Sequence, residues 1–239
     1  MNSVLKCVGL CKRFGKRQVL KEVSITAQSG QVVGILGPNG AGKTTAFKSI
    51  LGIVIPDKGD IFLNDEKITH LPIHERAKRG IAYLPQESSI FRGLKVGENL
   101  EVILRLNAKK GKELKELSES LLSDFGISHL RDQQADLISG GEKRRLEFAR
   151  TLALSPHFIL LDEPFVGIDP ITVKDIQKMI LKLKERSIGV IVTDHDVTSL
   201  SKVVDVLYVL NKGEVIASGL PEKVLNDPGV IENYLGKEE

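Results

Sequence analysis

The sequence predicts an α/β fold with a mostly parallel sheet and an inserted helical lobe. Apolar runs of strand length alternate with segments of helical pattern, and the run at 30–37 has the unbroken apolar character of a buried strand. Strand-like runs disappear between Val96 and Leu130, where the pattern becomes helical. With 239 residues and 41% hydrophobic content, the chain is long enough for one large α/β domain.

The first half of the chain alternates between strands and helices. Gly52 should end the first helix, since glycine commonly follows the last helical residue, and Pro72 suits the first position of the second helix. Pro85 should end the strand before it, because proline has no N–H to donate to a sheet. The expected elements are strands over 4–9, 19–28 and 30–37, a helix from the turn at 42–45 to 52, a helix over 72–79 and a strand over 80–85.

The second half begins with the helical lobe and then returns to alternation. In the lobe, charged stretches such as 109–126 replace the strand-like runs. Near the C-terminus, the residues 211–213 supply the turn of a hairpin. The expected elements after the lobe are a helix following Gly141, a strand over 158–164, a helix over 170–186, a strand over 189–195 and a hairpin over 205–219.

Composition excludes several classes of protein. The 34 lysines and arginines against 31 acids leave a formal charge of +3, too near neutral and too evenly spread for nucleic-acid binding. Basic clusters such as Lys12-Arg13 are interpreted as solvated faces. Cys7 and Cys11 lack partners at metal-binding spacing and fit a reduced, cytosolic setting. No apolar run is long enough to span a membrane, and the start lacks the pattern of a signal peptide, so membrane contact is expected only through partners.

A phosphate-binding loop is the clearest motif. The stretch "GPNGAGKT" matches G-x-x-x-x-G-K-[ST] and stands between a buried strand and the start of a helix, where this motif functions. Its glycines let backbone N–H groups surround a phosphate, Lys43 would reach the β- and γ-oxygens, and Thr44 would hold Mg²⁺. The predicted nucleotide-binding residues are Gly37, Pro38, Asn39, Gly40, Ala41, Gly42, Lys43, Thr44 and Thr45.

Two acids follow a later buried strand. The four apolar residues 158–161 bring Asp162 to a carboxyl end of the sheet, where open α/β sheets bind their ligands. Asp162 would act on Mg²⁺, and Glu163 could polarise the attacking water. The alternative is that these acids cap a helix. His195 follows another strand of the same sheet and is interpreted as a γ-phosphate contact, with a structural histidine as the alternative.

These residues together resemble the ATPase subunit of ABC transporters, and the resemblance covers nearly the whole chain. The marks of the family occur in the family's order: Walker A at 37–44, the Q-loop glutamine Gln86, the signature Ser139-Gly140-Gly141-Glu142, Walker B at 158–162 with Glu163, a D-loop around Asp169 and the switch histidine His195. The signature departs from the usual Leu-Ser-Gly-Gly-Gln at Ile138 and Glu142. The isoleucine is a conservative change, and glutamate at the fifth place occurs in some subfamilies.

The resemblance implies a fold and a set of cofactors. It implies one ABC ATPase domain over 1–239, with a P-loop NTPase core, an N-terminal antiparallel β-subdomain and a helical subdomain at about 87–155. It implies ATP and Mg²⁺, with Gln86 joining Thr44 and Asp162 at the metal and Glu163, His195 and Gln86 acting in catalysis. Phe14 matches the aromatic residue that stacks on adenine; the alternative is a core residue at a strand end.

The resemblance also implies partners. Two ATPase subunits of this family dimerise head to tail, so that each ATP lies between the Walker A loop of one subunit and the signature of the other. The dimer works with transmembrane permease subunits, which places it on the cytoplasmic face of the inner membrane. The segment 86–98 is the expected socket for a permease helix, with Phe91 and Arg92 as contacts and Asp169 at the subunit interface. The alternative is that Phe91 belongs to the core of the helical lobe.

The cargo is harder to predict than the chemistry. The runs at 80–100 and 161–176 and the ending Tyr234-Leu235-Gly236 are similar to the ATPase of the lipopolysaccharide export system. The nearest rival is the ATPase of branched-chain amino-acid importers. A soluble ABC protein of DNA repair or translation would carry a long coiled coil or two tandem ATPase domains, and this chain has one Walker A and one signature. A pure nucleotide-binding module would not need Glu163 and His195.

Overall fold

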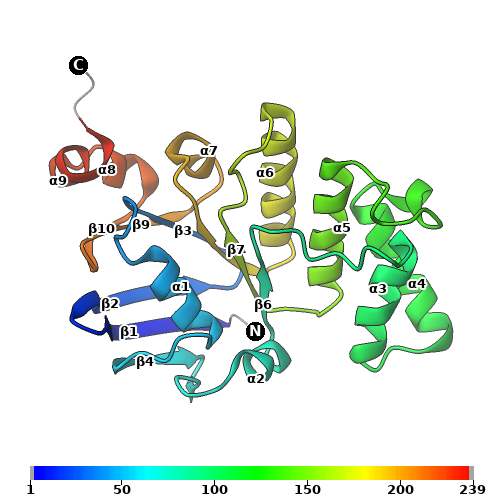
Figure 1. The fold of residues 1–239 in the computed structure, drawn as a ribbon, viewed down its shortest axis with the longest axis horizontal. Helices are drawn as coiled ribbons and strands as arrows, with labels where there is room; N and C mark the ends of the chain where they lie inside the picture. Colours follow the sequence, from blue (N-terminus) through cyan, green and yellow to red (C-terminus); the bar gives the residue numbers. More distant parts are fainter. Residues whose placement is uncertain (1–2, 237–239) are drawn as a thin grey trace. The chain divides into compact units, whose positions relative to one another are not determined.

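Two compact units make up the protein in the computed structural model, which describes residues 3–236. The ends of the expected 1–239 domain, residues 1–2 and 237–239, lie outside the described part. The first unit combines the chain up to Ile81 with the chain from His157 onward, and the second unit is Ala82–Pro156. Figure 1 follows the chain through both units.

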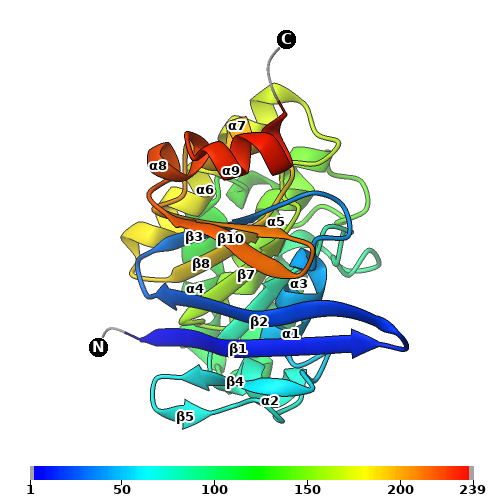
Figure 2. The same ribbon diagram turned by 90° about the vertical axis from the view of Figure 1, so that its left-hand side faces the viewer.

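An antiparallel sheet forms the N-terminal part of the first unit, as the family resemblance implied. Its strand order is β2-β1-β4-β5, and Figure 2 shows β1 and β2 as a long ribbon pair. The strands are β1 (Val4–Phe14), β2 (Arg17–Gln28), β4 (Lys58–Leu63) and β5 (Glu66–Lys67). Neither β4 nor β5 was among the predicted strands, and β5, with two exposed residues, carries no apolar signal.

A mostly parallel sheet forms the core of the first unit and confirms the predicted fold class. Within this unit the order is β10-β9-β3-β8-β7, with β9, β3, β8 and β7 parallel and β10 antiparallel at the edge. Every residue of β3 and β8 is buried, which explains their unbroken apolar runs. The strands are β3 (Val32–Leu36), β7 (Phe158–Asp162), β8 (Gly189–Thr193), β9 (Val206–Asn211) and β10 (Glu214–Gly219).

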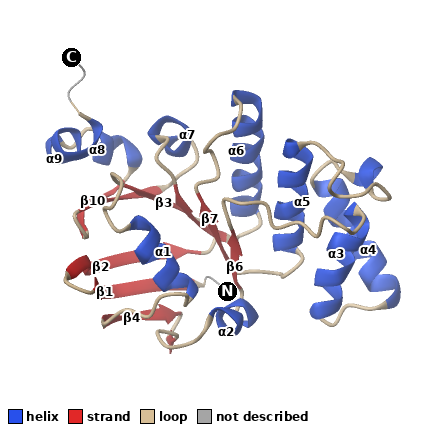
Figure 3. Cartoon of the chain, in the orientation of Figure 1, coloured by secondary structure: helices blue, strands red, loops and turns tan. Residues whose placement is uncertain are grey.

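Three helices of the first unit, α1, α2 and α6, follow the prediction, and the four short helical segments after β8 were not predicted (Figure 3). Gly52 ends α1 with a φ of 77°, as expected of a glycine after a helix. Pro72 precedes the first helical residue of α2 instead of occupying it, and the helix ends at Lys78. The helices are α1 (Lys43–Leu51), α2 (Ile73–Lys78), α6 (Pro170–Glu185), α7 (Val197–Ser201), α8 (Pro221–Leu225), α9 (Pro228–Val230) and the π-helical turn η2 (Ile231–Leu235).

A buried arginine fastens the far end of α1. The Arg76 side chain is 1% exposed and donates to the carbonyl oxygens of Ser49 and Ile50 at 2.7 and 2.6 Å. Burial lowers the pKa of Arg76 to about 10, which still leaves it charged near neutral pH. A cation at the carboxyl end of α1 stabilises the helix, because the carbonyl groups there carry partial negative charge. The helix that begins at the phosphate loop is therefore anchored at its other end.

The second unit is helical, apart from β6 (Ile81–Leu84), in which the chain passes into it. Ser139 caps α5, so this helix begins at Gly140, earlier than expected. The other elements are α3 (Val96–Leu106), α4 (Gly111–Asp124), the 3₁₀ turn η1 (Ser128–Leu130) and α5 (Gly140–Leu152). Among residues 3–236, no helix combines the length and the apolar character needed to cross a membrane.

Candidate functional site

Three neighbouring parallel strands of the first unit end at the candidate site. β8 lies between β3 and β7, and Thr193 of β8 is in register with Ile35 on one side and with Asp162 on the other. Because these strands run in the same direction, the segments that follow them leave the sheet at one edge. These segments are the phosphate loop (37–42) after β3, the switch turn (194–196) after β8 and the acidic segment (162–165) at the end of β7.

The phosphate loop needs its glycines for packing as well as for phosphate approach. Gly37 has a φ of 147°, and a Cβ there would lie 2.1 Å from the carbonyl oxygen of Leu210. Gly42 has a φ of 109°, and a Cβ there would lie 2.8 Å from the carbonyl oxygen of Val19. No larger residue fits these distances without a backbone shift. The phosphate loop thus packs closely against β9 and β2, and this packing alone requires glycine at both positions.

Lys43 binds the backbone of its own loop, and the charges of two acids act on it. Its side chain is 6% exposed, and Nζ donates to the carbonyl oxygens of Gly37 at 2.6 Å and Pro38 at 3.2 Å. Burial lowers the pKa of Lys43, while the negative charges of Glu163 and Asp194 act in the opposite direction. The charges of both carboxylates thus influence the pKa of Lys43.

Asp162 and Glu163 stand at the end of β7 and cap no helix, so the helix-cap alternative is wrong. The hydroxyl of Thr193 donates to Asp162 Oδ1 at 2.9 Å, and the Glu163 N–H donates to the Thr193 carbonyl oxygen at 2.8 Å. Glu163 has a φ of 44°, in the left-handed region that residues with a side chain seldom occupy. Backbone strain of this kind is concentrated at functional sites. The strand pattern gave no sign of it.

The oxygen donors of the site suit Mg²⁺. Thr44 is exposed at the start of α1, and Asp162 is half-buried at the end of β7. Hydroxyl and carboxylate oxygens are hard ligands, and Mg²⁺ at nucleotide sites uses one or two protein groups and completes its shell with phosphates and water. Within residues 3–236, no group of three His, Cys, Asp or Glu side chains forms a metal cage. The oxygen atoms of Thr44 and Asp162 fit a Mg²⁺ ion that nucleotide phosphates and water also ligate.

His195 is exposed, and the residue before it is fully buried. Sequence reasoning identified the histidine and missed Asp194, whose carboxylate accepts the backbone N–H of His195 at 2.8 Å. The only signal in the sequence was its position beside a candidate residue. The structure brings His195, Asp162, Glu163 and the phosphate loop to one edge of the sheet.

Tyr234 is a second residue that sequence reasoning did not place at the site. It is half-buried in the π-helical turn η2, the last described element of the chain. Burial raises the pKa of Tyr234, as does the charge of Asp194, whereas a hydrogen bond from the Gly37 backbone lowers it. The C-terminal segment thus returns to the phosphate loop. In the sequence, this tyrosine was only a mark of family resemblance.

Phe14 lies at the end of β1 and is 51% exposed, so the interpretation as a core residue is wrong. Lys12 Nζ lies 5.5 Å from the centre of its ring. A cleft of about 480 Å³ opens beside the phosphate loop, in the size range of small-ligand sites. Its lining residues are Arg17, Gln18, Val19, Lys21, Pro38, Asn39, Gly40, Ala41, Asn211 and Lys212.

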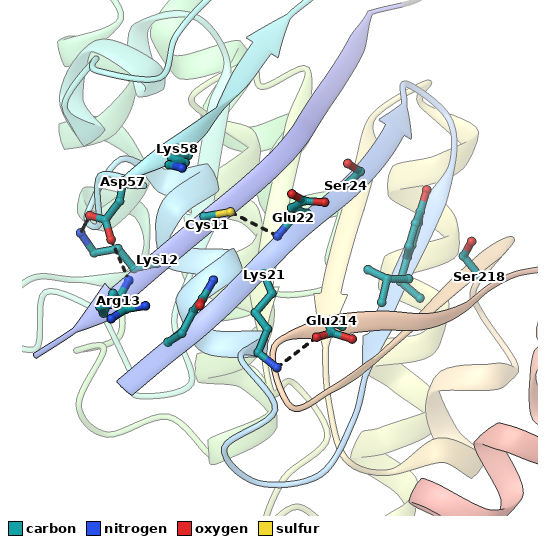
Figure 4. A pocket seen from close by; sticks show the side chains of 13 residues that line it. Cys11, Lys12, Arg13, Lys21, Glu22, Ser24, Asp57, Lys58, Glu214 and Ser218 are labelled. Carbon is teal, nitrogen blue, oxygen red and sulfur yellow. Dashed lines mark hydrogen bonds and ion pairs between the residues drawn. The ribbon is translucent and has the colours of Figure 1, made fainter. Parts of the chain in front are cut away.

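A larger pocket of about 850 Å³ is lined by the antiparallel sheet and by β9 and β10, and no predicted site residue lines it (Figure 4). Its charged side chains largely neutralise one another. Lys12 pairs with Asp57 at 2.8 Å, and Lys21 pairs with Glu214 at 3.0 Å. Volume alone therefore does not identify the reacting site, and we assign that site from the chemistry of the phosphate loop.

The signature forms the exposed start of α5 in the second unit. Ser139 caps the helix, and its N–H and hydroxyl donate to Glu142 Oε2 at 2.8 and 2.7 Å. These hydrogen bonds hold the pKa of Glu142 below its ordinary value. A Cβ at Gly140 would meet nothing within 4 Å. The helix start is open to a ligand, and the unusual Glu142 has a local role as half of a capping box.

The segment after β6 presents Phe91 at the surface of the second unit. Phe91 is 39% exposed, so its interpretation as a core residue of the lobe is wrong. The buried Asn99 side chain binds the backbone of Phe91. It accepts from the Phe91 N–H at 2.9 Å and donates to the Phe91 carbonyl oxygen at 3.1 Å. The Arg150 guanidinium lies 4.2 Å from the ring centre. Gln86 and Arg92 are exposed on the same segment.

Asp169 begins α6 in the first unit and is exposed. Its carboxylate accepts the N–H groups of Ile171 and Thr172 at 2.9 and 3.0 Å and the Thr172 hydroxyl at 2.6 Å. These hydrogen bonds, that of the Thr172 side chain above all, lower the pKa of Asp169. The residue thus has a clear role as a helix cap within its own chain.

The chain is similar to known families and proteins that bind ATP. The family model described as "ABC transporter" matches residues 20–166, and one described as "Branched-chain amino acid ATP-binding cassette transporter" matches residues 214–239. The chain is 48% identical to the lipopolysaccharide export system ATP-binding protein LptB of Haemophilus influenzae, over 99% of this chain and 98% of the relative. It is 46% identical to LptB of Escherichia coli K12, with the same coverage.

Solved structures give the same result for the fold. The ADP conformation of MJ1267, an ATP-binding cassette of an ABC transporter, superposes with a TM-score of 0.86 at 29% identity, over 98% of this chain and 99% of the other. CbiO1 of Clostridium perfringens, part of the ABC transporter complex CbiONQ, also has a TM-score of 0.86, at 28% identity over 97% of this chain and 94% of the other.

Proposed function

Since this chain belongs to the ATP-binding subunits of ABC transporters and hydrolyses ATP to drive transport, we propose that its cargo is lipopolysaccharide, exported from the inner membrane. The observation that carries the proposal is the near-half identity to LptB proteins over almost the whole of both chains. We propose that the chain 1–239 acts as one ABC ATPase domain, with a helical subdomain at about 87–155, on the cytoplasmic face of that membrane.

Within the site, we assign one role to each group. Lys43 binds the β- and γ-phosphates, Phe14 stacks on the adenine, and Glu163 takes the proton of the attacking water. Thr44 and Asp162 would hold Mg²⁺. The bound ion would neutralise charge on the phosphates. His195 contacts the γ-phosphate.

We also propose that two copies of the chain dimerise head to tail. The exposed start of α5 supports this, because Ser139 and the N–H groups that follow it form a second anion-binding site in a chain that already has one. In the dimer, Ser139, Gly140 and Gly141 would contact the ATP of the partner subunit, and Asp169 would lie at the interface.

The cargo can be tested with the intact complex. We would capture the chain with its membrane subunits from the inner membrane of the source cells, place the complex in vesicles that contain lipopolysaccharide, and add ATP. We expect ATP-dependent release of lipopolysaccharide, absent when ATP is replaced by ADP.

Branched-chain amino-acid import is the second candidate, because the C-terminal residues 214–239 match the corresponding family model. ATP-dependent uptake of leucine should therefore be measured in the same vesicles. ATP-dependent leucine uptake without release of lipopolysaccharide would overturn the export proposal and support the importer.

Phe91→Ala should abolish assembly with the membrane subunits and leave the isolated chain folded. We propose that the segment Gln86–Glu98 receives a helix of the permease, with Phe91 and Arg92 as its contacts. Loss of an anchor buried in such a socket costs about 2 kcal/mol or more of binding. The ring is partly exposed in the free chain and touches Arg150. Its removal should therefore cost fold stability only about as much as an exposed cation–π contact, roughly 0.5 to 1 kcal/mol.

Capture of the membrane subunits and thermal unfolding of the free variant together test the socket. Leu106→Ala is the matched control, since Leu106 is a highly exposed apolar residue of the same unit outside the segment, and this variant should assemble normally. A large drop in the melting temperature of Phe91→Ala, with capture reduced only in proportion to the folded fraction, would contradict the proposal.

A further inference from the structure

Asp194 is a fully buried carboxylate at the reacting edge of the sheet. It follows β8 directly and is 0% exposed. Its Oδ1 accepts the backbone N–H groups of His195 at 2.8 Å and Asp196 at 2.9 Å, and its Oδ2 accepts the N–H of Phe165 at 2.9 Å. None of the family motifs assigned above uses this residue.

Such a carboxylate stays buried only when it is well compensated. Removing a charged group from water is costly, and hydrogen bonds to the ionised form offset that cost. Three N–H donors and the nearby Lys43 provide this compensation. An apolar side chain would have filled this buried position without the cost of burying a charge. The three hydrogen bonds show which backbone segments the Asp194 carboxylate binds.

The two oxygens bind different segments. Oδ1 holds the turn that carries His195, and Oδ2 holds Phe165, which lies two residues after Glu163 and 29 residues from Asp194 in the sequence. Phe165 is itself buried at 4% exposure, so its backbone has little freedom once this bond is made. A single side chain thus ties the acidic segment to the switch turn.

We propose that Asp194 is a positioning residue for ATP hydrolysis, which sets His195 and Glu163 in one geometry by binding the backbone of both segments. The inference rests on the roles proposed above for His195 and Glu163. The left-handed backbone of Glu163 makes such support necessary, because a strained conformation persists only where its surroundings hold it. The charge of Asp194 also raises the pKa of Lys43, in the phosphate loop, and of Tyr234, in the C-terminal segment.

Asp194→Asn isolates this role. The amide has nearly the same shape but only one oxygen, so its NH₂ group must oppose either the Phe165 N–H or the N–H groups of the switch turn. One of the two segments is then released. Because a small misplacement of reacting groups can cost about a hundredfold in rate, we expect kcat of the full-length chain to fall by roughly 10- to 100-fold.

The KM of Asp194→Asn for ATP distinguishes a loss of positioning from general damage to the ATP site. The substitution leaves Lys43 and its hydrogen bonds to the phosphate loop in place, so KM for ATP should change by less than about twofold. Asp205→Asn is the matched control: Asp205 also accepts a backbone N–H, from Val32 at 2.9 Å, and it is not part of the assigned site. This control should lose some thermal stability and keep its kcat.

Several outcomes would overturn the proposal. These are a KM that rises as much as kcat falls, a kcat near that of the parent chain, or failure of both Asp194→Asn and Asp194→Ser to fold where Asp205→Asn folds. His195→Ala, measured in parallel, tests the site assignment itself. A near-parent kcat in His195→Ala would overturn that assignment and the Asp194 inference with it. A low kcat in His195→Ala beside a near-parent kcat in Asp194→Asn would overturn the Asp194 inference alone.

Discussion

Glu163→Gln is expected to bind ATP and to lose hydrolysis by about 10²- to 10⁴-fold, the usual contribution of a general base. The amide keeps the shape of the side chain and cannot accept the proton of the attacking water. The Glu163 N–H bond to the Thr193 carbonyl oxygen involves the backbone alone, so the substitution leaves it in place. The phosphate loop is unchanged, and the dimer should therefore accumulate with ATP bound.

ATP turnover, nucleotide binding and size-exclusion chromatography with ATP test this prediction. Glu185→Gln is the matched control, because it makes the same chemical change at an exposed position near the end of α6, outside the assigned site. The control should hydrolyse ATP at the parent rate. Turnover by Glu163→Gln at a near-parent rate would show that another group removes the proton.

A mixture of Lys43→Ala and Gly140→Asp chains should recover ATP hydrolysis that neither chain has alone. Lys43→Ala damages the phosphate loop. Gly140→Asp places a carboxylate at the start of α5, where a phosphate would bind, and its Cβ has room in the structure. In a heterodimer, one composite site combines an intact loop with an intact signature. Random pairing of equal amounts makes half of the dimers mixed, so about a quarter of the parent activity should return.

A second mixture controls for effects of mixing. Lys43→Ala and Glu163→Gln both damage the first-unit side of the site, so their heterodimers contain no intact composite site and should stay inactive. Melting temperatures of the separate chains would check that each is folded. Measurable and equal activity in the two mixtures would contradict a site shared between subunits. If neither mixture is active, crosslinking from Ser139 to ATP bound on the other chain tests the shared site directly.

The motifs and most elements could be predicted from the sequence because they depend on neighbouring residues. A strand buried on both faces has to be apolar throughout, so β3, β7 and β8 could be recognised from their composition. A helix that stops at a glycine shows its end in the sequence, as α1 does at Gly52. The phosphate loop and the signature are contiguous, and their chemistry follows from residue type and spacing.

Exposure and backbone strain could not be predicted in this way. Phe14 and Phe91 each had two interpretations, because an aromatic residue at the end of an element can face either the core or the solvent. Only the packing of residues distant in the sequence decided that both are exposed. The positive φ of Glu163 is likewise imposed by its surroundings, since nothing in the type of this residue favours that conformation.

The sequence by itself determined which residues are candidates for the chemistry, and the tertiary structure decided which of them lie together. Strand order is a property of the sheet, and the position of β8 between β3 and β7 brings the switch turn beside the phosphate loop and the two acids. Contacts between residues distant in sequence join Asp194 to the segment after Glu163 and Tyr234 to the phosphate loop. Local patterns report local conformation, whereas a buried carboxylate is held by donors that folding alone brings together.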